Sequence, residues 1–145
     1  MPAATPREVV EHLLRLTAEG PAESMADLFA EDAVFEMPFL PPGAPRPEPG
    51  REAFRAHLKG AVGLQEFDSI DELHLHQTTD PDVVIAEYRL HGRAVLTGKR
   101  FASHLVLVAR IHDGLIVRAR TYANPLDNAV AFDMVDDLLT GLTAA

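Results

Sequence analysis

The chain has 145 residues, 47% hydrophobic and 24% charged, a balance typical of a globular domain that buries roughly 70% of its unfolded surface. Its formal net charge of −9 argues against a nucleic-acid interface and against docking to an anionic membrane. The absence of cysteine excludes disulfides and Cys-ligated metal sites, and no apolar run is long enough to span a membrane. We expect one cytoplasmic domain over residues 1–145.

Helical spacing of apolar residues characterises the first sixty positions. The segment Thr5–Glu8 has the form of a capping box with proline at the first helical position, and the helix it opens ends at Gly20. A second, short helix is expected from Pro21, and a third over about 51–59. Six prolines between positions 38 and 49 predict a stiff loop, because proline lacks the backbone donor that a helix or central strand needs.

Alternation with a period of two characterises the chain after Asp68. The turns between the expected strands, such as Asp113-Gly114, are too short for crossover helices, which predicts an antiparallel sheet. Helices followed by a meander of strands indicate an α+β fold, with three N-terminal helices packed on a curved antiparallel sheet and a blind cavity at its open end. The expected strands are 33–37, 69–79, 83–90, 99–112 and 115–122, and a closing helix is expected at 127–140.

Four stretches, 25–38, 38–46, 50–57 and 109–125, resemble the SnoaL-like branch of the nuclear transport factor 2-like superfamily, which includes polyketide cyclases and ketosteroid-isomerase relatives. The "GRE…H" and "NP" motifs are similar to those of phenazine-biosynthesis A/B-type proteins. The resemblance implies a cone-shaped α+β barrel, a hydrophobic small-molecule ligand, no cofactor, and a homodimer through the convex sheet face.

The family's catalytic positions are mostly apolar in this chain. The ketosteroid-isomerase base falls at Met37, its oxyanion tyrosine at Leu13 and its protonated aspartate near Leu107. The last-strand carboxylate of the polyketide cyclases and phenazine-biosynthesis proteins falls at Thr121, whereas the helix histidine of the latter matches His57. Proton transfer and oxyanion stabilisation need ionisable or donor groups. The resemblance therefore leaves His57 as the candidate acid or base.

Two functions from different classes fit this pattern. The first is an enzyme of the SnoaL-like type that performs isomerase, cyclase or condensation-type proton transfer on a hydrophobic cyclic or polyketide-like substrate. The second is a non-catalytic small-molecule binding protein of the same fold, which the missing polar positions favour. The predicted pocket is walled by Leu13, Met37, Phe54, His57, Leu107, Ala109 and Thr121.

The remaining candidates each have a structural alternative. His57 at a helix end could simply bond a carbonyl or water. His74 and His76 share a strand face and could ligate a metal, but no third ligand is spaced to join them, so a half-exposed sheet face is favoured. Alternation places His104 on the dimer side of the sheet, and Glu36 is expected to cap or to form an ion pair with Arg46 or Arg51. No metal site is predicted.

Overall fold

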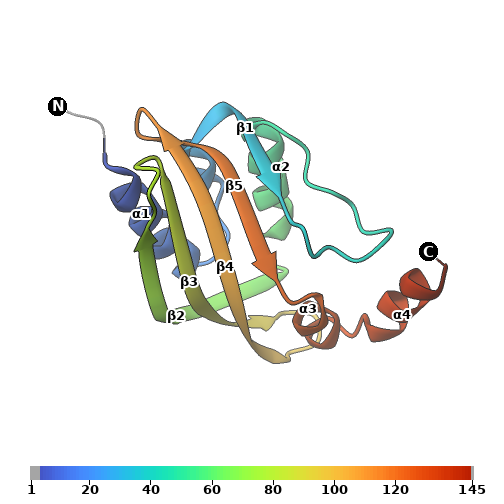
Figure 1. Ribbon diagram of the computed structural model, residues 1–145. Helices are drawn as coiled ribbons and strands as arrows, with labels where there is room; N and C mark the ends of the chain where they lie inside the picture. The colour runs from blue at the N-terminus through green and yellow to red at the C-terminus, as the bar shows by residue number, and fades with distance from the viewer. Residues whose placement is uncertain (1–3, 145) are drawn as a thin grey trace.

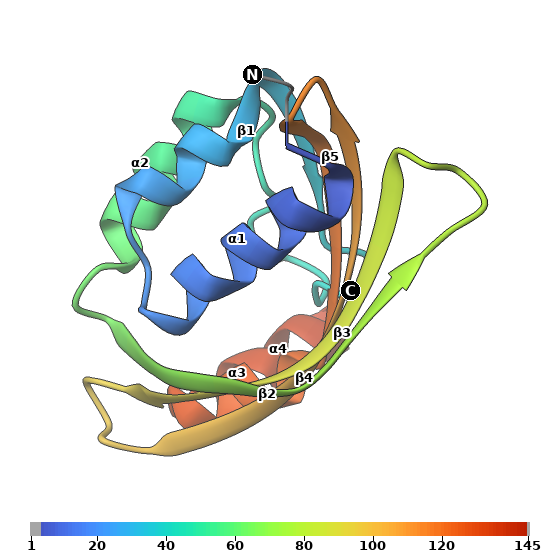
Figure 2. The same cartoon turned by 90° about the vertical axis from the view of Figure 1, so that its left-hand side faces the viewer.

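The computed structural model describes residues 4–144 as a curved five-stranded sheet with helices on its concave side (Figures 1 and 2). The helices are α1 (Pro6–Ala18), the 3-10 helix η1 (Glu23–Leu28), α2 (Arg51–Ala61), α3 (Pro125–Ala131) and α4 (Val135–Ala144). The strands are β1 (Phe29–Glu36), β2 (Gln65–Gln77), β3 (Val83–Ala94), β4 (Arg100–His112) and β5 (Leu115–Ala123). The α+β cone expected from the sequence is confirmed.

The order of strands across the sheet is β1-β5-β4-β3-β2, so the long strand β4 is central. Strands β2 to β5 form an antiparallel meander, as the short turns predicted. The expectation of a wholly antiparallel sheet is wrong at one edge, because β1 pairs parallel with β5. No hairpin joins these two strands, since α2 and three other strands lie between them in the chain, and so turn length does not constrain their relative direction.

Two of the expected helices differ in detail. The second helix is a 3-10 helix, Glu23–Leu28, whose preceding residue provides no side-chain cap. The single closing helix is instead two helices, because Asp133 adopts a left-handed φ of 56° that interrupts the helical path between α3 and α4. Figure 1 shows α4 extending away from the sheet, and none of its residues is buried.

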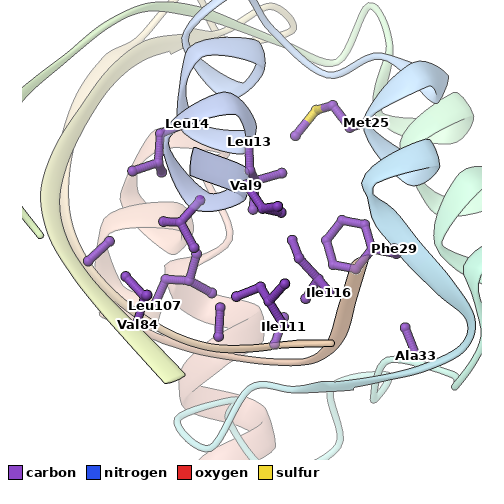
Figure 3. Close-up of a cluster of buried hydrophobic side chains, with 14 of the residues drawn as sticks. Val9, Leu13, Leu14, Met25, Phe29, Ala33, Val84, Leu107, Ile111 and Ile116 are labelled. Carbon is purple, nitrogen blue, oxygen red and sulfur yellow. The ribbon is translucent and has the colours of Figure 1, made fainter. Parts of the chain in front are cut away.

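The core lies between α1 and the concave face of the sheet. Helix α1 buries Val9, Val10, Leu13 and Leu14, which recur at helical spacing, and Thr5 caps its first turn by accepting a hydrogen bond from the Glu8 amide. Figure 3 shows the α1 side chains converging with those of Leu107 and other sheet residues. None of the helices within residues 4–144 is long and apolar enough to cross a membrane.

The two faces of the sheet carry different side chains. Along β3 the buried positions Val84, Ala86, Tyr88 and Leu90 alternate with more exposed positions such as Glu87. The buried set faces the helices, and the alternate set forms the outer, convex face. Cross-strand pairs of opposite charge lie on the outer face, such as Arg89 with Asp71, 2.8 Å apart, and such pairs favour this register.

Candidate functional site on the concave face

Three hydroxyl side chains lie on the otherwise apolar concave face of the sheet. Tyr88 is on β3, Ser103 on β4 and Thr121 on β5, each in phase with the buried positions of its strand. Tyr88 pairs with Leu105, and Thr121 pairs with Leu107. The strand alternation therefore places the three hydroxyls on successive concave rows, about 7 Å apart along the strands.

One of these hydroxyls, the Ser103 Oγ, is buried without a hydrogen-bond partner among residues 4–144. Tyr88 is 8% exposed, and burial raises its pKa to about 12, so that its hydroxyl stays protonated at neutral pH. A buried hydroxyl without a partner costs free energy, which a bound oxygen atom or a water molecule can recover. The concave face therefore offers neutral hydrogen-bond donors to a ligand oxygen.

Most of the residues predicted to wall the pocket belong to the packed interior. Leu13, Leu107 and Ala109 are 7%, 3% and 0% exposed and pack in the main core, whereas Met37 and Thr121 are half-buried. Leu107 and Thr121 form a cross-strand pair, one row along the sheet from the pair of Tyr88 and Leu105.

The two predicted helix residues point to different surroundings. Phe54 packs in an aromatic cluster, with ring centroids 4.8 Å from Phe29 and 4.6 Å from Phe35. His57 lies on the exposed side of α2. Phe54 is thus part of the interior, whereas His57 is on the surface.

A hollow of about 360 Å³ lies where the C-terminal end of α1 approaches the start of β2. Its lining includes Gly20, Val62 and Phe67. Phe67 pairs with Gly92 and packs edge-on against Phe101, at the same end of the concave face as Ser103. None of the seven predicted pocket residues lines this hollow, and neither do Tyr88, Ser103 and Thr121.

The other candidates of the sequence lie on the outer face. His76 bonds Glu87 at 2.6 Å, and His104, which is on the outer face as predicted, bonds Glu72 at 3.0 Å. Within residues 4–144, no group of three or more His, Asp or Glu side chains is arranged to hold a metal ion. Glu36 forms an ion pair, but with Arg118 on β5 and not with Arg46 or Arg51. The partner of Glu36 could not be predicted from the sequence because β1 and β5 are distant in the chain.

The curved sheet and the helices on its concave side define the class of cone-shaped α+β folds. A family model described as the SnoaL-like domain matches residues 10–119. The chain belongs to this SnoaL-like family.

Known relatives agree with this assignment. An uncharacterised PhzA/B-like protein from Pseudomonas aeruginosa is 33% identical over 130 residues, covering 90% of this chain and 92% of the relative. The crystal structure of a candidate isomerase from Bacillus subtilis superposes with a TM-score of 0.83 at 29% identity, covering 89% of this chain and 93% of that one. A candidate polyketide cyclase from Pseudomonas putida gives a TM-score of 0.74 at 19% identity, with 89% and 98% coverage. The cone fold and the SnoaL-like assignment are thus confirmed.

Sequence reasoning missed Tyr88 and Ser103 as site residues. A signal was present, because Tyr88 alternates in phase with Leu90, and Ser103 with Leu105 and Leu107. The family comparison directed attention to helix and last-strand positions instead. In this chain the donors lie on the two adjacent central strands.

Proposed function

We propose that this protein binds a hydrophobic cyclic or polyketide-like molecule that carries a carbonyl or similar oxygen, which accepts a hydrogen bond from Tyr88. The observation that carries the proposal is the Tyr88 side chain, which is 8% exposed on an apolar wall and whose pKa burial raises to about 12, so that its hydroxyl remains a neutral donor. Such a donor favours an oxygen acceptor on the ligand. The names of relatives that mention polyketide cyclase support this class of ligand.

Catalysis of the isomerase or cyclase class is the second candidate function. The observation in its favour is again Tyr88, because a donor in a water-poor site stabilises negative charge that develops on a carbonyl oxygen. His57, the acid or base predicted from the sequence, is on the exposed side of α2. If the site is catalytic, we therefore expect turnover to depend on Tyr88. His57→Ala should lower turnover only if His57 performs the proton transfer that the resemblance implies.

The first experiment is a thermal-shift titration with a steroid enone, a flat aromatic polyketide quinone, a phenazine carboxylic acid and a fatty acid. A ligand that binds only the folded state raises the unfolding midpoint, by about 2.7 kcal/mol of stabilisation at a hundred times its Kd. Tyr88→Phe is expected to weaken the best ligand about tenfold, because one hydrogen bond to a buried acceptor is lost.

Tyr122→Phe is the matched control. It removes the same hydroxyl from the only other tyrosine, which lies on the outer face against Phe39. Equal affinities for wild type and Tyr88→Phe would refute the role of Tyr88. No shift with any of the four compounds would refute the ligand class.

We also propose a homodimer through the outer face of the sheet, as the resemblance implied. Its support is the apolar pair of Ile85 and Val106, half-buried side chains on adjacent central strands of that face. Light scattering over a dilution series tests this proposal, and a monomer at every concentration would refute it.

A further inference from the structure

A second hollow, of about 230 Å³, lies on the outer face and is distinct from the concave site. We name it the arginine hollow. It is lined by Val83, Val108, Arg110, Arg118 and Arg120, from β3, β4 and β5. Three of its five lining side chains are guanidinium groups and none is acidic, although the chain as a whole carries a formal charge of −9. The lining of the hollow is therefore positively charged, whereas the protein as a whole is negatively charged.

Two of the three arginines are held in place by carboxylates at the rim. The Nε of Arg118 donates to the Oε1 of Glu36 at 2.5 Å, and a terminal nitrogen of Arg110 lies 3.0 Å from Asp80. The hydrogen bond from Arg118 keeps the pKa of Glu36 below its ordinary value, so Glu36 stays ionised at neutral pH. Because Arg118 uses Nε for this contact, the pair orients the guanidinium group and leaves its terminal nitrogens available to another acceptor.

Arg120 has no ion-pair partner among residues 4–144. Its Nε is buried and makes no hydrogen bond within that part of the chain, and its guanidinium lies 5.8 Å from the ring centroid of Tyr122. A buried charged donor without an acceptor is costly, more so than a neutral one. An acceptor from outside the described chain would remove this cost.

The balance of charges around the arginine hollow also favours an external acceptor. Arg110 and Arg118 are directly opposite one another on β4 and β5, and like charges in this position destabilise a sheet. Three guanidinium groups against the two carboxylates of Glu36 and Asp80 leave one uncompensated positive charge at the hollow. An anion seated between the arginines would offset both the cross-strand repulsion and the unpaired Nε.

We propose that the arginine hollow binds a small oxyanion, the phosphate or carboxylate group of a free metabolite. Planar guanidinium groups match the oxygens of such groups in bidentate geometry, and the valine floor excludes water from one side of the contact. The site is independent of the ligand proposed for the concave face, because the two lie on opposite faces of the sheet.

Isothermal titration of the full chain with inorganic phosphate tests the proposal, at an ionic strength of about 0.02 M where screening is weak. Chloride at equal ionic strength is the reference, and succinate in a parallel titration distinguishes a carboxylate from a phosphate ligand. Saturable binding of either anion is expected in wild type. Arg120→Gln should weaken it about tenfold, since one charge-assisted contact is lost.

Arg100→Gln is the matched control. It removes one positive charge from the same strand face, but at the far end of β4, where Arg100 pairs with Asp68 at 2.9 Å. Arg120→Lys keeps the charge and loses the planar fork, so its affinity should fall between those of wild type and Arg120→Gln. Circular dichroism of each variant establishes that it is folded.

Three results would overturn the proposal. The first is the absence of saturable binding for both anions, and the second is equal weakening by Arg100→Gln and Arg120→Gln. The third is a change in dimer dissociation on Arg120→Gln without anion binding in wild type, which would assign the hollow to a carboxylate of a second copy. None of these results bears on Tyr88→Phe, so failure here is separable from failure of the proposed ligand site.

Discussion

Gly92 lies on the concave face near the end of β3, where there is no space for a side chain. A Cβ at this position would lie 2.5 Å from the carbonyl oxygen of Glu66 and 2.7 Å from the Cζ of Phe101. The phenylalanine ring can turn aside, but the Glu66 oxygen belongs to the backbone of the paired strand β2. Relief of that contact requires the β2 and β3 backbones to move apart locally, so Gly92→Ala should cost about 3 kcal/mol, the upper part of the usual range for overpacking.

Urea denaturation measures this cost. For a slope of about 2 kcal/mol per molar, the unfolding midpoint of Gly92→Ala should fall by about 1.5 M. Gly60→Ala is the control, because no atom lies within 4 Å of its Cβ position in α2. That variant should gain roughly 0.5 kcal/mol from helix propensity. A midpoint for Gly92→Ala equal to or above that of wild type would refute the assigned register.

Two further perturbations test the core and the outer face. Leu107→Ala, at a position 3% exposed on the central strand, should lower the free energy of unfolding by about 2–5 kcal/mol, and a loss below about 1 kcal/mol in urea would show a loosely packed interior. The hydrogen bond from Arg89 lowers the pKa of Asp71 from 3.8 to about 2. The ion pair therefore stabilises the fold fully above pH 3.8, and this stabilisation is lost as the pH falls toward 2. Asp71→Asn should flatten the dependence of the free energy of unfolding on pH between those values. An unchanged slope would count against the pair.

Local features of the fold could be predicted from local sequence. The Thr5 cap and the apolar spacing of α1 specified the first helix, and the alternation of β3 and β4 specified their hairpin, because these signals depend on neighbours a few residues apart. The closing helix was predicted as continuous because its apolar spacing continues through the interruption. The left-handed Asp133 that divides it had no distinctive local signal.

The sites depended on contacts that no local pattern contains. The sequence by itself determined the succession of helices and strands, the side of each strand that is apolar and the family. Only the tertiary structure placed β1 parallel to β5, and thus Glu36 beside Arg118. Likewise, only strand pairing brought the hydroxyls of Tyr88 and Ser103 onto one wall. The physical reason is that burial of the whole core selects which distant strands become neighbours, whereas alternation fixes only the face of each residue within its own strand.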